Sequence, residues 1–307
     1  MILQKFGRRI LQNAQKPSQV HRCKSQSTAE YCLNNVRQYD YDNFTCTLLL
    51  KNSARACAFA VRGFNVEVSR VAEQVSQDTI GLMRLKFWEE TVDKCFTKDV
   101  KKVPQHPVAI EIYKALLNNQ LTKRYFKNLI EVRKDNLNMK HFNSLEDMEK
   151  YAEKSVSSVY YLILEGCGVK NMHADHAASH LGKAQGITQQ LRSIPHSKRL
   201  NFIPLPQDIL IRNNLSQEEV IRGKSSSKLQ DTIFEVASRA HQHLVKARSL
   251  SESVPKEGRA ALLPAVPIYS FLDRLQKVNY DVFHPGLQNR PWTILPRLYV
   301  SNLRNKY

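Results

Sequence analysis

The chain has 307 residues, 42% of them apolar, and carries a formal net charge of +18. This length allows one large domain, or two ordinary ones, with a sizeable buried core. No apolar stretch approaches the roughly 18 residues of a membrane-spanning helix, so any membrane contact should be peripheral. The six cysteines contain no C-x-x-C pair. Free or buried thiols in a reducing compartment are therefore expected rather than a disulfide framework.

The positive charge does not by itself indicate a nucleic-acid-binding protein. After Ala29 the basic and acidic residues are interspersed, with neither an aromatic-rich RNA-binding motif nor zinc-finger spacing. A basic surface can equally well face anionic lipid or an acidic protein subunit. We therefore expect no nucleic-acid partner.

Residues 1–29 have the composition of a mitochondrial transit peptide. They contain six basic residues and no Asp or Glu, and the first acidic residue is Glu30. Ile2, Phe6 and Ile10 recur at helical spacing beside Arg8 and Arg9, which predicts a basic amphipathic helix. The alternative is a disordered basic tail. We predict a transit peptide over residues 1–29 and a single folded domain over residues 30–307.

The rest of the chain is predicted to be all-α. Pro107 opens one helix, Ser144 caps another, and no convincing strand alternation competes. Glycine and proline are sparse over long stretches, which favours helices further. Together these patterns predict a bundle of roughly ten helices. The expected helices span residues 45–75, 79–95, 107–118, 122–132, 144–162, 174–192, 216–222, 228–248 and 262–278.

The C-terminal stretch from Trp292 to Tyr307 allows two interpretations. Leu295, Leu298 and Leu303 interleave with basic residues, as in an interfacial helix that lies on a membrane. The same pattern suits a last helix packed on the core. We favour packing on the core.

Two segments more than 100 residues apart carry a resemblance to a known family. The first runs from Arg55 to Glu73 and is preceded by Tyr31-Cys32. The second runs from Leu181 to Arg192 and is followed by Phe202-Ile203-Pro204. Together they resemble the squalene/phytoene synthase family. The resemblance implies an isoprenoid-synthase-type helical bundle.

Members of this family bind isoprenyl diphosphates through magnesium, which aspartates on two facing helices hold. Magnesium prefers hard oxygen ligands and neutralises the departing diphosphate. The corresponding positions are Ser69, Arg70 and Glu73 on the first helix, and Ser193 and Ser197 on the second. Only Glu73 has a carboxylate, and the chain has no acidic residue from residue 176 to residue 207. We therefore expect a pseudoenzyme without a bound metal or cofactor.

The departures from the family pattern resemble those of its mitochondrial branch, complex I assembly factor 6. The segments 63–67 and 184–192, with Pro195 soon after, carry this match. It implies a non-catalytic factor that acts early in complex I assembly, on the matrix side of the inner membrane. Its partners would be complex I subunits or assembly intermediates, with peripheral membrane contact. The alternatives are an isoprenoid-diphosphate or lipid-binding protein, or an atypical prenyltransferase.

The resemblance also places candidate ligand contacts around a central cavity, which Ser69, Glu73, Ser193 and Ser197 should face together. Arg55 and Arg62 could contact a phosphate, or pair with a glutamate such as Glu67 or Glu73. His173, His176 and His180 share one helical face and could hold a metal, but polar cavity lining is the favoured reading. The possible cavity residues are Arg55, Arg62, Arg192, Lys198, His176 and His180.

Overall fold

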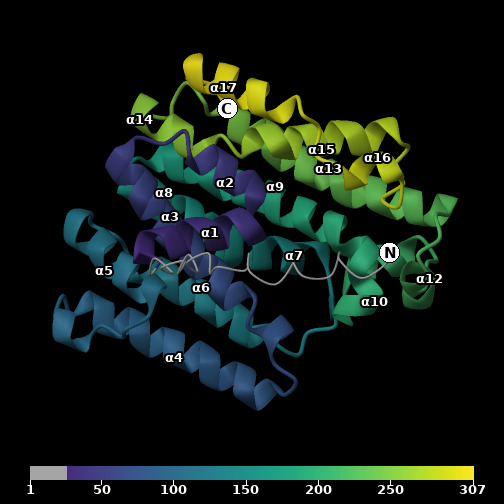
Figure 1. Cartoon of the computed structure of the whole chain (residues 1–307). Helices are drawn as coiled ribbons and strands as arrows, with labels where there is room; N and C mark the ends of the chain where they lie inside the picture. The colour runs from purple at the N-terminus through teal and green to yellow at the C-terminus, as the bar shows by residue number, and fades with distance from the viewer. Residues whose placement is uncertain (1–25) are drawn as a thin grey trace, which may run out of the picture.

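The computed structural model describes residues 26–307, which form one bundle of helices (Figure 1). The first part of the bundle precedes the long central helix. It consists of α1 (Thr28–Tyr39), α2 (Tyr41–Thr47), α3 (Asn52–Ser69), α4 (Asp78–Phe96), α5 (Pro107–Asn118), α6 (Lys123–Asp135), α7 (Leu145–Ala152) and α8 (Ser158–Gly166). Short 3₁₀ turns, η1 (Ala72–Gln74) and η2 (Val100–Lys102), follow α3 and α4. The π-helical turn η3 (Glu153–Ser157) joins α7 to α8.

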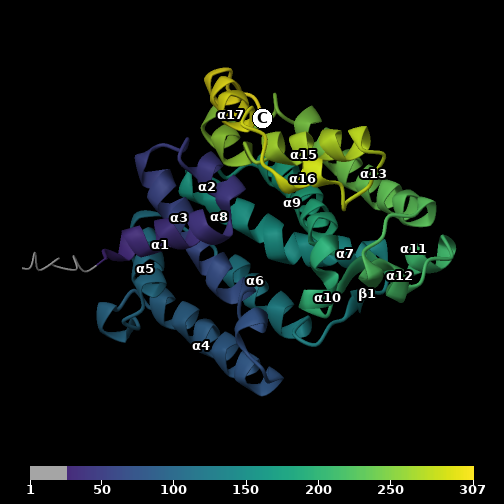
Figure 2. The same ribbon diagram turned by 45° about the vertical axis from the view of Figure 1, so that its right-hand side comes forward.

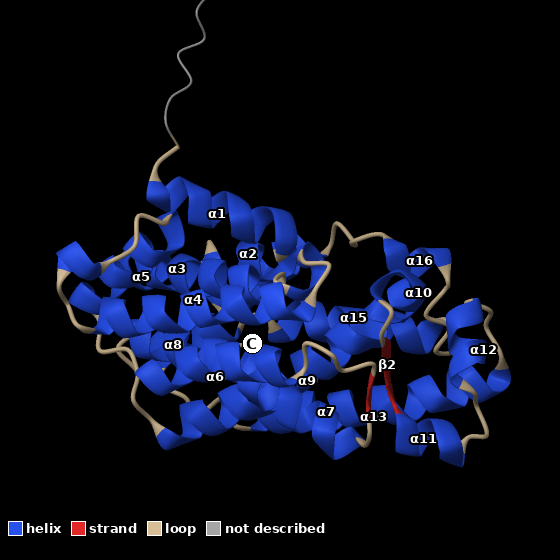
Figure 3. Ribbon diagram, turned by 90° about the horizontal axis from the view of Figure 1, so that it is seen from below, coloured by secondary structure: helices blue, strands red, loops and turns tan. Residues whose placement is uncertain are grey.

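The second part of the bundle starts with α9 (Met172–Ser193). It continues through η4 (Ile194–His196), α10 (Ser197–Leu200), α11 (Gln207–Arg212), α12 (Gln217–Arg222), α13 (Ser227–Ser249), α14 (Lys256–Arg259), η5 (Ala260–Leu262), α15 (Ala265–Lys277), α16 (Pro285–Gln288) and α17 (Ile294–Leu303). Two short strands, β1 (His141–Phe142) and β2 (Ile203–Pro206), pair in parallel. Figure 3 shows these strands at the end of the bundle near α10 to α12.

The long helices α9 and α13 pack along each other. Helix α3 packs on α1, α5 and α8, whereas α4 packs on α5 and α6. Turning the molecule shows α4 at one edge and α15 to α17 at the opposite edge (Figure 2). One continuous core of buried apolar side chains links α1 to α15, which agrees with the predicted single bundle.

Local sequence signals explain where several helices begin. Ser144 accepts a hydrogen bond from the Asp147 amide, and Pro107 occupies the first turn of α5. Ser216 and Glu219 form a reciprocal capping box at α12. The N-cap of α1 is Ser27, so the predicted domain start at Glu30 falls inside this helix. The predicted transit-peptide helix lies mostly in residues 1–25, outside the described residues.

Helix α9 packs very closely on the end of α7 and the π turn η3. A Cβ atom added at Gly182 would lie 2.1 Å from Ser157 Oγ and 2.7 Å from the Ser157 backbone. One added at Gly186 would lie 2.4 Å from Ala152 Cβ. Two glycines one helical turn apart therefore let α9 touch the backbone of its neighbour.

Three expectations from the sequence need correction. The helix predicted over residues 45–75 is two helices, because the chain turns at Leu48–Lys51 and α3 ends at Ser69. The two short strands were not predicted. Helix α17 buries Leu298 but leaves Leu295 and Leu303 exposed, so the favoured packing on the core describes only part of it. Between residues 26 and 307, no helix is both long and apolar enough to cross a membrane.

Candidate functional site

A cavity of about 300 Å³ lies between α3 and α9, where the resemblance predicts one. Its walls come from α1, α2, α3, η1, α6, α7, η3, α8 and α9. The residues that line it are Tyr39, Asp40, Asn43, Arg62, Asn65, Val66, Ser69, Arg70, Glu73, Arg133, Tyr151, Ser155, Val156, Val159, Tyr160, Gln185, Gln189 and Gln190.

Three predicted positions of the first helix line this cavity near its exposed mouth. Ser69 donates a hydrogen bond to the Val66 carbonyl at 3.0 Å, so its hydroxyl serves the helix end. The Arg70 guanidinium lies 3.5 Å from the centre of the Tyr39 ring. Glu73 is exposed and belongs to η1 rather than to α3. These three side chains therefore share one region, as the resemblance predicts.

The two serines of the second helix do not line the cavity, which corrects the expectation that four residues face it. Ser193 ends α9 and donates to the Gln190 carbonyl at 2.8 Å. Ser197 is buried and donates to the Ile194 carbonyl at 2.7 Å. Pro195 lies in the 3₁₀ turn between them, so one continuous α-helix does not carry both serines.

Neutral amides from α9 occupy this wall instead. Gln185 and Gln189 are one helical turn apart and both line the cavity, followed by Gln190. Gln185 accepts a hydrogen bond from the Tyr160 hydroxyl. The i, i+4 spacing of these glutamines is visible in the sequence. The family pattern predicts carboxylates on this wall, however, so the glutamines were not among the predicted cavity residues.

Arg62 is buried in the cavity wall and pairs with a different acid from the one expected. Its Nη1 lies 3.8 Å from Asp40 Oδ2, and its guanidinium lies 5.9 Å from the Tyr160 ring centre. Burial raises the pKa of Asp40, although the charge of Arg62 opposes this shift. The proposed pairing of Arg62 with Glu67 or Glu73 is wrong. Glu67 accepts hydrogen bonds from Tyr31 and Asn35.

Arg133 of α6 lines the cavity but was not predicted from the sequence. Its Nη2 donates to Asn65 Oδ1 at 3.2 Å, and its Nε has no hydrogen-bond acceptor within residues 26–307. Burial lowers the pKa of this guanidinium. No acidic residue within that range forms an ion pair with it. Within residues 26–307, the cavity therefore contains a half-buried cation without a carboxylate partner.

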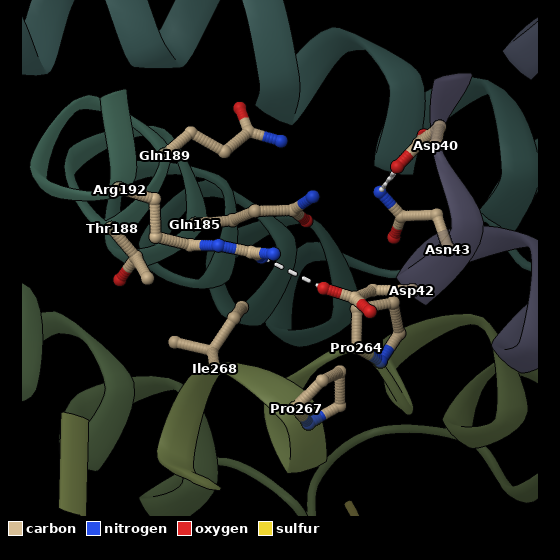
Figure 4. Close-up of a pocket in the computed structure, with 10 residues that line it drawn as sticks. All are labelled: Asp40, Asp42, Asn43, Gln185, Thr188, Gln189, Arg192, Pro264, Pro267 and Ile268. Atoms are coloured by element: carbon tan, nitrogen blue, oxygen red, sulfur yellow. Dashed lines mark hydrogen bonds and ion pairs between the residues drawn. The ribbon is translucent and has the colours of Figure 1, made fainter. Parts of the chain in front are cut away.

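The remaining predicted basic residues lie outside this cavity. Arg55 donates from Nε to the Leu50 carbonyl at 2.9 Å and supports the turn before α3. Lys198 is exposed on α10. Arg192 does not line the cavity and points toward Asp42, with 2.7 Å between Arg192 Nη1 and Asp42 Oδ2 (Figure 4). Figure 4 also shows the Asn43 amide against Asp40, in an adjoining pocket of about 40 Å³.

Two of the three predicted histidines, His176 and His180, form a separate cluster with His243 between α9 and α13, and His173 is exposed, so the expectation that they line the cavity is wrong. His180 Nε2 lies 3.1 Å from His176 Nε2, and His180 Nδ1 lies 2.8 Å from His243 Nδ1. His243 Nε2 lies 3.2 Å from Glu149 Oε1. Burial, followed by the charges of His243 and His176, lowers the pKa of His180 to about 4. This cluster joins the two longest helices between residues 26 and 307.

Within the described part of the chain, no three His, Cys, Asp or Glu side chains are placed to hold a metal ion. The five cysteines of that part are free. Burial raises the pKa of Cys32, Cys46 and Cys57 to about 12 and that of Cys95 to about 11. The cavity chemistry therefore depends on arginines, amides and two acids, Asp40 and Glu73.

The family model for squalene/phytoene synthase matches residues 36–296, which include every wall of the cavity. The chain belongs to the squalene/phytoene synthase family. A squalene synthase of this fold, HpnC from Alicyclobacillus acidocaldarius, superposes with a TM-score of 0.73 at 17% identity, and the match covers 83% of this chain and 95% of that one. This structural likeness establishes the all-α isoprenoid-synthase fold predicted from the sequence.

Two curated relatives within this family are much more similar in sequence. The proteins from Bos taurus and Homo sapiens are each 42% identical over 281 residues, covering 91% of this chain and 83% of theirs. Both are named NADH dehydrogenase (ubiquinone) complex I, assembly factor 6. A 15-cis-phytoene synthase from Synechococcus elongatus is 20% identical over 288 residues, covering 90% of this chain and 92% of its own. The resemblance stated from the sequence segments is thus confirmed.

Proposed function

We propose that this chain is a non-catalytic assembly factor for mitochondrial respiratory complex I, acting early in assembly on the matrix side of the inner membrane. The observation that carries the proposal is the 42% identity to complex I assembly factor 6 over 91% of the chain. The named relatives assemble complex I, and the same scaffold would here bind complex I subunits or intermediates, in peripheral contact with the membrane.

The charges of the cavity support the non-catalytic part of the proposal. Three arginines and two acids, Asp40 and Glu73, line it. Asp40 already pairs with Arg62 and has a raised pKa, so Glu73 is the one exposed carboxylate of the described wall. A magnesium ion needs several oxygen ligands and is repelled by nearby cations. The cavity wall therefore offers too few carboxylates to hold the magnesium that assists ionisation of a diphosphate.

Depletion of the protein from cells tests the proposed function. Assembled complex I on native gels and NADH-linked respiration should fall, while succinate-linked respiration and cellular sterols remain largely unchanged. An active prenyltransferase would give the opposite pattern. Normal complex I after complete depletion would refute the assembly role. Purified protein with magnesium should also fail to condense farnesyl or geranylgeranyl diphosphate above background.

A second candidate function is binding of an isoprenoid diphosphate or lipid in the cavity without turnover. The observation that favours it is the Arg133 guanidinium, which lines a cavity of about 300 Å³ and has no carboxylate partner within residues 26–307. Calorimetry with farnesyl diphosphate in the absence of magnesium would test it. Arg133→Met should abolish the heat of binding, whereas Arg212→Met, an exposed arginine on α11, should not.

The mitochondrial address is also a proposal, because residues 1–25 lie outside the described residues. Six basic residues and no acidic residue before Glu30 support it. A fusion of residues 1–35 to a fluorescent protein should enter mitochondria, and cytosolic fluorescence would contradict the proposal. Thr28 lies in the first turn of α1. Its hydroxyl donates a hydrogen bond to Glu111 Oε1 at 2.5 Å and accepts one from Lys114 Nζ. We expect processing before Ser27, which would leave α1 complete.

A further inference from the structure

The surface of α17 is apolar, exposed and separate from the central cavity. Trp292, Leu295, Tyr299 and Leu303 are 82%, 55%, 59% and 67% exposed. Leu295, Tyr299 and Leu303 recur every four residues and so lie along one side of the helix, and Trp292 lies in the turn that precedes the helix. Leu298 alone of this helix is buried. Figure 1 shows α17 at the outer edge of the bundle, at the top of the view.

Positive charge flanks this apolar strip. Residues 282–307 contain Arg290, Arg297, Arg304 and Lys306 and no acidic residue. Arg297 and Arg304 form no ion pair with any residue from 26 to 307, whereas Lys306 lies 3.9 Å from Glu252. An apolar strip with Trp, Tyr and flanking arginines matches a helix lying in a membrane interface, where aromatic rings and long basic side chains are stabilised.

A cavity of about 370 Å³ at the start of α17 extends the positive surface. Arg192 Nη1 and Arg290 Nε bind the two oxygens of Asp42 at 2.7 Å and 3.2 Å. Arg274 Nη1 donates to the carbonyls of Gly286 and Asn289 at 3.0 Å and 2.8 Å. Three guanidinium groups around one carboxylate leave two positive charges in excess. Planar guanidinium groups suit the oxygens of a phosphate group.

We propose that α17 docks on an anionic phospholipid bilayer. Trp292, Leu295, Tyr299 and Leu303 enter the boundary between headgroups and acyl chains. One headgroup phosphate binds in the cavity of Arg192, Arg274 and Arg290. This inference deepens the peripheral membrane contact of the proposed function by naming its surface and its lipid charge. The aromatic side chains of the strip and the positive charges that flank it together favour a bilayer over an acidic protein.

The full chain should be tested by flotation with vesicles of phosphatidylcholine alone or phosphatidylcholine mixed with phosphatidylglycerol. We expect binding to the anionic vesicles, and its loss at high salt because salt screens exposed charges. Tryptophan fluorescence reports the docked surface directly. The chain has two tryptophans, and Trp88 is 4% exposed whereas Trp292 is 82% exposed. Vesicles should therefore shift the Trp292 emission to shorter wavelength and protect it from acrylamide.

Matched variants separate this surface from general exposure. The triple change Trp292→Ser, Leu295→Ser, Leu303→Ser should weaken vesicle binding by roughly tenfold or more. The control triple Met83→Ser, Leu117→Ser, Ile211→Ser alters side chains that are 72%, 54% and 66% exposed elsewhere, and should leave binding unchanged. Circular dichroism should show that both variants remain folded.

Charge variants test the electrostatic half of the proposal. Arg297→Glu with Arg304→Glu should abolish the preference for anionic vesicles. The control pair Lys101→Glu with Lys224→Glu, exposed on other elements, should keep that preference. Arg290→Gln should weaken binding to anionic vesicles. Unchanged binding would show that no headgroup phosphate binds in the cavity beside Arg290.

Three results would overturn docking of α17. They are no vesicle binding by the wild-type chain, equal binding to neutral and anionic vesicles, and equal losses in the serine triple and its control. Capture of acidic peptides without vesicle binding would assign the strip to a protein instead. Vesicle binding needs no complex I, whereas the depletion experiment needs no purified lipid. Failure of docking is therefore distinguishable from failure of the assembly role.

Discussion

The seam between α9 and η3 and the mouth of the central cavity both involve α9, η3 or their neighbours in one bundle, but they differ in packing. At the seam, Gly182 and Gly186 bring α9 against the backbone of Ser157 and the side chain of Ala152. At the mouth, Ser69 and Glu73 are exposed. The seam has no room for a larger side chain, whereas the mouth accommodates different polar groups.

This difference separates the contacts that hold the bundle together from the side chains that line its cavity. A close helix contact depends on shape, and one added side chain displaces both partners. A solvated cavity rim depends on charge, and its side chains contribute little to stability. A protein that uses this scaffold for binding should therefore be sensitive at the seam and tolerant at the rim.

Gly182→Trp should have the largest effect. An indole cannot fit where a single Cβ already comes within 2.7 Å of the Ser157 backbone. We expect a loss of about 3 kcal/mol or more in the free energy of unfolding, at the upper end of overpacking effects. His173→Trp, on an exposed position of the same helix, is the control and should change it little. Chemical denaturation of both variants would measure this, and a stable Gly182→Trp protein would contradict the close contact.

Ser197→Asp should come second, because restoring a family carboxylate here places a charge at a buried position. The Ser197 side chain is 2% exposed and donates to the Ile194 carbonyl, which a carboxylate cannot replace as a donor. The expected loss is about 1–3 kcal/mol or more. Ser69→Asp, at the exposed mouth, should lose far less. Equal thermal stability of the two variants would show that Ser197 is not buried in this way.

The third prediction concerns the pH dependence of the α9–α13 contact. His180 has a pKa of about 4 in the folded chain and an ordinary value of 6.5. The unfolded chain therefore binds more protons between these values, and stability falls as pH decreases from 6.5 to 4. His180→Gln should flatten the decrease of Tm in this window, and the change is about 2–4 °C for each kcal/mol.

Glu149 provides an internal control for this pH window. Burial would raise its pKa, but the nearby His243 and the hydrogen-bonded Arg239 lower it to about 2 from 4.5. Its contribution is present above pH 4.5 and is lost as pH falls toward 2. Glu149→Gln should therefore alter stability mainly below the window of His180. If His180→Gln left the profile from pH 6.5 to 4 unchanged, the histidine would not be buried between the helices.

Glu73→Gln should have the smallest effect. The side chain is exposed and makes no ion pair with residues 26–307, so we expect a change within about 0.5 kcal/mol. The variant should restore complex I in depleted cells as well as wild type does. If a folded, abundant Glu73→Gln protein failed to rescue complex I, Glu73 would have a role in ion binding or acid chemistry.

Most helices could be predicted because their signals are local. Pro107 and the Ser144 cap determine helix starts that depend on neighbouring residues alone. The turn at Leu48–Lys51 has no glycine or proline, and tertiary contacts stabilise it. Leu50 is buried and its carbonyl accepts from Arg55. The π turn of η3 likewise depends on the approach of α9 and has no sequence signal of its own.

The candidate site was predictable only where the helix continued. The helical periodicity of α3 correctly places Ser69 and Arg70 at the cavity. On the other wall, the 3₁₀ turn that contains Pro195 follows α9, so helical periodicity no longer predicts where Ser197 lies. Arg133 comes from α6, and only the fold brings it to the cavity. Histidines on one face of α9 looked like cavity lining because their distant neighbours, His243 and Glu149, were unknown.

The buried thiols described above provide a way to follow how the bundle opens. Each of the first four helices contains one buried cysteine: Cys32 in α1, Cys46 in α2, Cys57 in α3 and Cys95 in α4. Burial and the raised pKa protect these sulfurs from alkylation while the helices stay packed. A maleimide pulse followed by peptide mass spectrometry would therefore record the order in which the four helices separate. The native sequence already contains the probes for such a measurement.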